Sequence, residues 1–117
     1  KVLIAQRQKD KFMADYWEFP GGKLEDDELP NQCLVREIKE ELGVDISDSC
    51  FTPITFTTYE YPDFSVIIYL YICREWDGFI QAKEGQSLRW CRPSELFETK
   101  MLPAGIPLIS YLRDTVS

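Results

Sequence analysis

The distribution of apolar residues predicts that much of the chain forms β-strands. Two runs rich in β-branched and aromatic residues, 51–61 and 65–76, are joined by Pro62-Asp63 and predict a hairpin. The tight-turn pair Asp77-Gly78 then predicts that the chain returns in another strand. The shorter strands expected from the same pattern lie at residues 2–5, 17–19, 79–82 and 88–91.

Helical periodicity is strongest in the first half of the chain. Pro30 suits the first turn of a helix, and Gly43 follows the last expected helical residue, Leu42. Apolar residues recur on one face of this helix, which we expect to pack against a sheet. An acidic loop at residues 23–29 precedes it, and shorter helices are expected at 93–97 and 106–114. Because strands outnumber helices, the predicted class is mixed α/β.

Length and composition favour a single domain over residues 1–117. A chain of this length is too short for two domains with separate cores, and it contains no internal repeat or linker-like tract. The longest apolar run, 66–73, is interrupted by tyrosines and is too short to cross a membrane. The N-terminus shows no signal-peptide pattern.

Charge and residue types limit the chemistry. The net charge is −7, whereas duplex nucleic acid and anionic membranes both require a basic partner surface. An acidic protein can still bind a phosphorylated small molecule when metal cations lie between the two. The four cysteines form no CxxC pair and there is no histidine, which argues against zinc and fits reduced thiols in the cytoplasm. Any chemistry therefore depends on carboxylates, Lys, Arg or a metal ion.

The predicted helix carries a crowded acidic face. Glu37, Glu40 and Glu41 fall within an arc of about 100°. Carboxylates at this spacing repel one another, and hard cations such as Mg²⁺ or Mn²⁺ prefer oxygen ligands. Two interpretations follow from this face alone: a solvated surface in which Arg36 and Lys39 screen the acids, or a metal site.

The helix is part of a longer pattern that begins at Gly22 and ends at Val44. The segment GKLEDDELPNQCLVREIKEELGV resembles the Nudix box, G-x5-E-x7-R-E-U-x-E-E-x-G-U with U aliphatic, at all nine specified positions. A match at nine positions over 23 residues is far more specific than a short glycine-rich motif.

The resemblance extends to nearly the whole chain and is closest to the MutT-like branch of the Nudix family, the nucleoside triphosphate pyrophosphohydrolases that sanitise nucleotide pools. It implies an α/β/α sandwich with a mixed, partly open sheet between helices, whose usual first strand would precede Lys1. The segments that carry it outside the box are Leu-Ile-Ala-Gln-Arg at 3–7, Trp-Glu-Phe-Pro-Gly-Gly-Lys at 17–23, Lys-Glu-Gly-Gln at 83–86 and Leu-Pro-Ala-x-x-Pro-Leu-Ile at 102–109.

The resemblance also implies a metal site for Mg²⁺, with Mn²⁺ as a second possibility. Its ligands would be the carbonyl of Gly21, the carboxylates of Glu37, Glu40 and Glu41, and a further acid, Glu84, in a loop before a late strand. Two or three such ions would neutralise the phosphate chain and acidify the attacking water. Either Glu37 or Glu84 would then accept the proton from that water.

Other residues of the pattern are expected to support or extend this site. By resemblance, Arg36 is chiefly structural and orients the box carboxylates, and Glu28 holds the preceding loop to the helix. Gly22 and Gly43 are the glycines of the box, and Lys23 corresponds to a position that faces the phosphates.

The nucleotide would be held outside the box. Arg7 and Phe19 correspond to a basic and an aromatic residue that hold the nucleotide, and Glu18 and Pro20 would line the same wall. Gly105 would also border the substrate, and it stands where the 8-oxoguanine specialists carry an Asn.

The base-side positions depart from the specialists' pattern. Gly105 offers backbone groups only, and Phe64 replaces a second base-side Arg. Related enzymes acting on CTP or modified cytosine nucleotides carry an Asp in the final motif, which Gly105 does not match either. The sequence therefore leaves the preferred base open.

The function expected from the resemblance is Mg²⁺-dependent hydrolysis of a nucleoside triphosphate to a nucleoside monophosphate and pyrophosphate, with 8-oxo-dGTP or a related modified nucleotide as substrate. Glu37, Glu41 and Glu84 would be the catalytic acids. The alternatives are a pyrophosphohydrolase for cytosine nucleotides, a hydrolase of another nucleoside diphosphate derivative, and a non-catalytic binding domain. The last class loses box acids, whereas this chain retains all of them.

Overall fold

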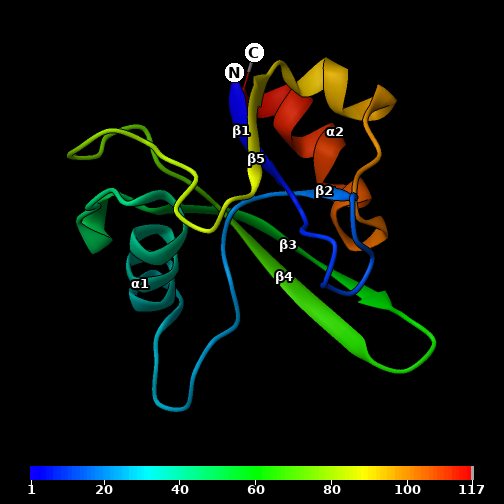
Figure 1. Ribbon diagram of the computed structural model, residues 1–117, viewed down its shortest axis with the longest axis horizontal. Helices are drawn as coiled ribbons and strands as arrows, with labels where there is room; N and C mark the ends of the chain where they lie inside the picture. The colour runs from blue at the N-terminus through cyan, green and yellow to red at the C-terminus, as the bar shows by residue number, and fades with distance from the viewer. Residues whose placement is uncertain (117) are drawn as a thin grey trace.

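A computed structural model describes residues 1–116 and shows short strands flanked by two helices (Figure 1). None of the helices within these residues is long and apolar enough to cross a membrane. The elements are β1 (Val2–Gln6), β2 (Trp17–Glu18), α1 (Pro30–Leu42), β3 (Thr52–Glu60), β4 (Ser65–Ile72), β5 (Ser87–Cys91) and α2 (Ile106–Thr115), with 3₁₀ turns η1 (Asp48–Cys50), η2 (Pro93–Glu98) and η3 (Pro103–Gly105).

The strands form two antiparallel sheets. The first has the order β2-β1-β5, and the second is the β3-β4 hairpin. In addition, Trp17 forms an isolated parallel bridge with Met101. The predicted α/β class is confirmed, and the hairpin at Pro62-Asp63 forms as expected.

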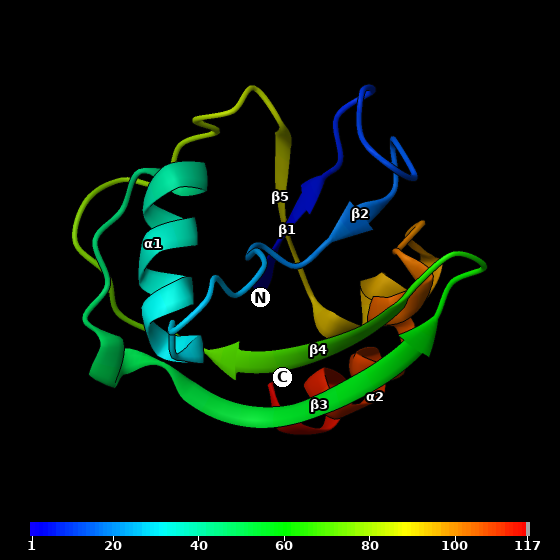
Figure 2. The same ribbon diagram turned by 90° about the horizontal axis from the view of Figure 1, so that it is seen from below.

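Strand β1 separates two hydrophobic clusters, because successive side chains of a strand point to opposite faces. Ile4 is fully buried in the larger cluster, which α2 closes with Leu108, Ile109 and Leu112. Its neighbour Leu3 packs against the smaller cluster, which α1 supplies. The two helices accordingly lie on different sides of the strands (Figure 2).

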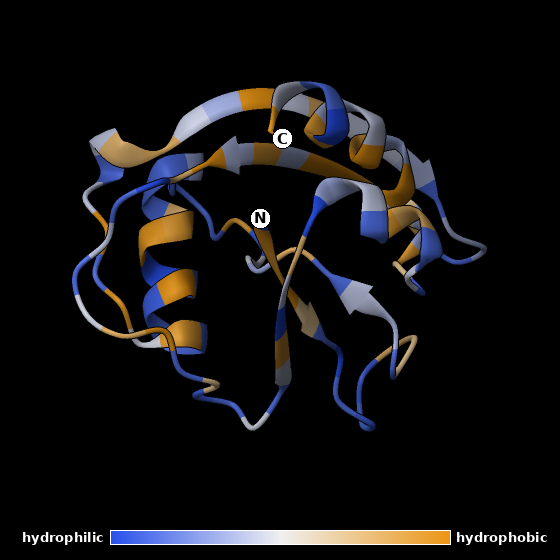
Figure 3. Cartoon of the chain, turned by 90° about the horizontal axis from the view of Figure 1, so that it is seen from above, coloured by the Kyte–Doolittle hydropathy of each residue, from blue (hydrophilic) through white to orange (hydrophobic). Residues whose placement is uncertain are grey.

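Helix α1 forms where the sequence predicted it. Pro30 occupies the first turn, and the Gln32 Oε1 accepts a hydrogen bond of 3.0 Å from the backbone N–H of Leu29. The helix ends at Gly43, which has a left-handed φ of 72° and donates its N–H to the Lys39 carbonyl. In the hydropathy view the helix shows apolar bands beside hydrophilic ones, while the connecting loops are mostly hydrophilic (Figure 3).

Two strand predictions were wrong, and backbone pairing explains both. Strand β4 ends at Ile72 because its partner there, Thr52, is the first residue of β3, so residues 73–76 have no strand to pair with. Residues 79–82 form no strand. Asp77 pairs back with Asp45, and the N–H of Gln81 then donates to the Leu42 carbonyl at the end of α1. The predicted helix at 93–97 is the 3₁₀ turn η2.

Candidate active site

The turn at Gly21-Gly22 packs directly against the acidic face of α1. The backbone N–H of Gly21 donates a 3.1 Å hydrogen bond to Oε2 of Glu41. A Cβ on Gly22 would lie only 2.1 Å from the Cδ of Glu37. A side chain at position 22 would therefore displace the Glu37 carboxylate, so glycine at this position permits the close approach of loop and helix.

Arg36 orients the acids around it. Its Nε and Nη2 donate two 2.9 Å hydrogen bonds to the Glu28 carboxylate, and its Nη1 lies 2.6 Å from Oε1 of Glu37. These bonds lower the pKa of Glu28 to about 2, and in turn they raise the pKa of Arg36. Arg36 also donates to the Lys23 carbonyl at 3.1 Å. The acidic loop is thereby held to the helix.

A second loop, residues 81–86, brings Glu84 to the C-terminal end of α1. The Glu41 carbonyl accepts hydrogen bonds of 3.0 Å from the N–H of Lys83 and from Nε2 of Gln86. The Lys83 side chain passes closely over Gly43, where a Cβ would lie 2.6 Å from its Cε. Gln8 adds a third connection by donating its side-chain amide to the Glu84 carbonyl. Glu84 itself makes no ion pair within residues 1–116.

Glu41 lies at the centre of these acids. The pKa of Glu41 is raised to about 8, chiefly by burial and further by the charges of Glu37, Glu84 and Glu18, against the lowering effect of the hydrogen bond from the Gly21 N–H. In residues 1–116 no three acids already stand as a complete ligand set. The oxygen donors nevertheless suit a hard divalent cation, which would favour the ionised form of Glu41.

The remaining predicted residues of this side lie at its edge. Glu40 is exposed, with its Oε2 3.9 Å from Nη1 of Arg36. Lys23 is exposed as well, and its backbone carbonyl is the group that contacts Arg36. Both side chains are open to solvent, where a phosphate chain could reach them.

The predicted base-side residues meet as a second group. Nη1 of Arg7 contacts both carboxylate oxygens of Glu18, at 3.0 and 3.2 Å. The ring of Phe19 comes within 3.6 Å of where a Cβ on Gly105 would lie, although 86 residues separate them in sequence. Pro20 is half-buried between this wall and the glycine turn. The fold therefore pairs Arg7 with Glu18, and Phe19 with Gly105, from distant parts of the chain.

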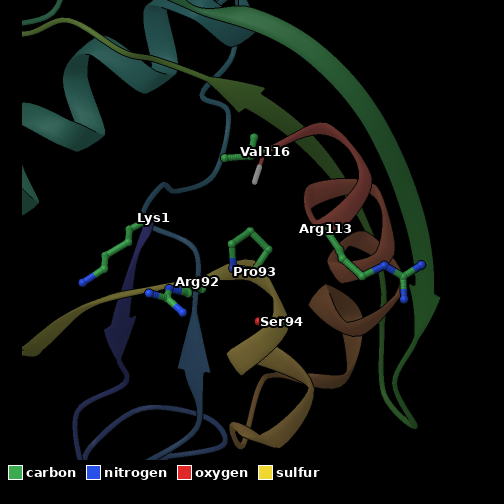
Figure 4. Close-up of a pocket in the computed structure, with 6 residues that line it drawn as sticks. All are labelled: Lys1, Arg92, Pro93, Ser94, Arg113 and Val116. Carbon is green, nitrogen blue, oxygen red and sulfur yellow. The ribbon is translucent and has the colours of Figure 1, made fainter.

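Sequence reasoning missed the groups that position these loops. Gln86 lies inside the Lys-Glu-Gly-Gln motif and could have been singled out, whereas Gln8 carried no recognisable signal. A cavity of about 370 Å³ lies elsewhere, at the start of β1 and η2, and none of the predicted site residues lines it (Figure 4). Its basic residues Lys1 and Arg92 contrast with the acidic site.

In this fold two acids of α1 lie against a glycine turn, and the distant loop that carries Glu84 is hydrogen-bonded to the end of the same helix. Carboxylate oxygens are ligands that suit hard metal cations. The NUDIX domain family model matches residues 1–112, and the chain belongs to the Nudix family. Its relatives place it with the MutT-like members, which confirms the resemblance found in the sequence.

Two curated relatives come from Escherichia coli strain K12. The CTP pyrophosphohydrolase is 38% identical over 111 residues, covering 93% of this chain and 79% of the relative. The 8-oxo-dGTP diphosphatase is 35% identical over 113 residues, covering 97% and 86%.

The chain is also similar in structure to solved proteins. The solution structure of the E. coli ORF135 protein superposes with a TM-score of 0.80 at 35% identity, covering 97% of this chain and 82% of that protein. A MutT structure from a study of Aliivibrio salmonicida and Vibrio cholerae gives a TM-score of 0.78 at 26% identity, covering 97% and 85%.

Proposed function

We propose that this Nudix protein hydrolyses nucleoside triphosphates to nucleoside monophosphates and pyrophosphate. The observation that carries the proposal is the position of Glu41, which is bonded to the Gly21 turn and surrounded by the charges of Glu37, Glu84 and Glu18. The relatives named 8-oxo-dGTP diphosphatase and CTP pyrophosphohydrolase support the same reaction class. A binding domain without activity would have no need for this full set of acids.

Nudix hydrolases typically use a divalent metal, and we propose Mg²⁺, with Mn²⁺ able to replace it. The proposed ligands are the Gly21 carbonyl and the carboxylates of Glu37, Glu40, Glu41 and Glu84. The bound cations would neutralise the phosphate charge and acidify the attacking water. The raised pKa of Glu41 supports this assignment, because a partly buried carboxyl among other acids is stabilised as an anion by a cation.

The chain's own groups would then orient the substrate and accept the proton. Arg36 and Glu28 hold Glu37 in place, and Lys23 is free to face the phosphates. Of the two candidates for the base, Glu37 already accepts a hydrogen bond from Arg36, whereas Glu84 makes no ion pair in the described part of the chain. We therefore assign the proton acceptor to Glu84, which can bind a cation through one carboxylate oxygen and accept the proton on the other.

The substrate base is the second part of the proposal. We propose a role in sanitising nucleotide pools, with 8-oxo-dGTP or a related modified nucleotide as substrate. A cytosine nucleotide is the second candidate, because Gly105 offers no side-chain amide and a relative at 38% identity is a CTP pyrophosphohydrolase. The four cysteines are free thiols, which supports a cytoplasmic location.

A pyrophosphate-release screen tests this function. The purified protein is incubated with Mg²⁺ and with dGTP, 8-oxo-dGTP, CTP or the other nucleoside triphosphates, and both products are quantified. We expect equimolar monophosphate and pyrophosphate with at least one substrate and none in EDTA. Release of inorganic phosphate instead, or no turnover of any triphosphate, would contradict the proposal.

A further inference from the structure

Tyr61 connects the β3–β4 hairpin to the turn that contains Gly105. Its hydroxyl oxygen accepts a 3.3 Å hydrogen bond from the backbone N–H of Ala104, a residue that is only 2% exposed. The backbone of Tyr61 is itself fixed, because its N–H donates to the Phe64 carbonyl at 2.8 Å and closes the hairpin. The phenol thus connects the hairpin turn to the Pro103–Gly105 turn.

The ring of Tyr61 is held by three other aromatic rings. Its centroid lies 5.3 Å from that of Phe12, 5.0 Å from Phe64 and 4.8 Å from Tyr59. Phe12 and Phe64 also contact each other edge to face, at 5.4 Å. Such pairs are favourable beyond the area they bury, so the cluster fixes the orientation of the phenol.

These contacts converge on the base-side wall. Phe12 belongs to the loop after Arg7, and its carbonyl accepts a 2.7 Å hydrogen bond from the Arg7 Nε. Ala104 immediately precedes Gly105, whose Cβ position faces the Phe19 ring. Tyr61 therefore contacts the Arg7 loop through Phe12 and the Gly105 turn through Ala104.

We propose that Tyr61 is a positioning residue for the nucleobase. By holding the Pro103–Gly105 turn through Ala104, its hydroxyl sets how Gly105 packs against Phe19, and so the shape of the wall that the base contacts. This inference rests on the proposed function, since it takes a nucleotide as the ligand. It concerns the base side alone, so the hydroxyl acts on nucleotide affinity and leaves the acidic site unchanged.

Metal-free nucleotide binding tests the inference separately from catalysis. The variant Tyr61→Phe keeps the ring and removes only the hydroxyl, and Tyr69→Phe, at an exposed tyrosine of β4 outside this cluster, is its control. Binding of 8-oxo-dGMP and of CMP is measured by titration calorimetry. For whichever nucleotide the unmodified protein binds, the Kd should be about fivefold higher in Tyr61→Phe, the order expected for the loss of one hydrogen bond. The control should bind within twofold of the unmodified protein.

Kinetics then separate positioning from general stability. With Mg²⁺ and a triphosphate substrate, Tyr61→Phe should raise KM by a similar factor and leave kcat within twofold. A lower melting temperature for Tyr61→Phe with an unchanged Kd would overturn the inference. So would a control variant that weakens binding as much as Tyr61→Phe does, or an unmodified protein that binds neither nucleotide. A protein that binds nucleotides in this Tyr61-dependent way but releases no pyrophosphate would contradict the proposed function alone.

Discussion

The acidic side and the base side of the site are assembled in different ways. On the acidic side, Gly22, Glu28, Arg36, Glu37 and Glu41 all come from 20 consecutive residues, and their hydrogen bonds connect one helix to the loop that precedes it. On the base side, Arg7, Phe19, Tyr61 and Gly105 come from four separate segments of the chain.

This difference has a consequence for specificity. The acids belong to a nine-position motif and their spacing is that of a helix, so their arrangement is set by residues close together in the sequence. The base-side wall depends on packing between segments, where one substitution, such as Gly for Asn at 105, alters the groups offered to the base. We expect substitutions on the acidic side to remove activity and those on the base side to redistribute it among substrates.

The largest effect is expected at Glu41. Glu41→Gln removes the charge at the centre of the acidic side and should lower kcat by about a thousandfold, the upper end of what the loss of one preorganised electrostatic group costs. Glu40→Gln should also abolish turnover. Steady-state rates at saturating Mg²⁺ provide the measurement, with Glu98→Gln as a surface control. Circular dichroism should show an intact fold, and a near-normal kcat for either variant would refute the metal-site assignment.

Glu84 tests whether the acidic side extends beyond the box. Glu84→Gln should lower kcat by at least about a hundredfold, within the range for positioned acid–base groups. Gln86→Ala should have a smaller effect in the same direction, because it removes the hydrogen bond that holds this loop to the Glu41 carbonyl. A loss below threefold for Glu84→Gln would mean that the residue is an ordinary loop acid.

Gly105 tests the base side. Its φ of −86° and the 3.6 Å contact with Phe19 allow a side chain at this position without backbone strain. Gly105→Asn should raise the preference for 8-oxo-dGTP over dGTP several-fold, about 1 kcal/mol for one hydrogen bond. Gly105→Ala, which adds a Cβ without an amide, is the control. Values of kcat/KM should show that the unmodified protein prefers 8-oxo-dGTP only modestly, or favours CTP. A preference for 8-oxo-dGTP of thousands-fold would show that another residue selects the base.

The smallest effect concerns stability in the absence of metal. The pKa of Glu41 is raised from 4.5 to about 8, chiefly by burial, so the folded state retains a proton that the unfolded state loses. Stability should therefore fall as the pH rises from about 4.5 to about 8 and then level off. Urea unfolding in EDTA at both ends of this range should show a steeper fall for the unmodified protein than for Glu41→Gln. Parallel pH profiles would mean that Glu41 does not titrate in this window.

Residues 79–82 illustrate why part of the fold escaped prediction. Their apolar composition after Asp77-Gly78 is typical of a returning strand, but Asp77 bonds to Asp45 and the following residues bond to the end of α1. The unpaired carbonyls at the C-terminus of a helix accept such hydrogen bonds, and no local sequence pattern predicts which segment will supply the donors. The same docking is what brings Glu84 to Glu41.

The sequence by itself determined helix α1, its start at Pro30 and its end at Gly43, and the acidic face, because helical spacing and capping act over a few residues. It also determined the class of fold and the family. Only the tertiary structure decided that Gln8 and Gln86 anchor the Glu84 loop, that Arg7 pairs with Glu18, and that Tyr61 reaches Ala104. These contacts join residues far apart in the chain, and their partners are set by how the sheets and helices pack rather than by any local spacing.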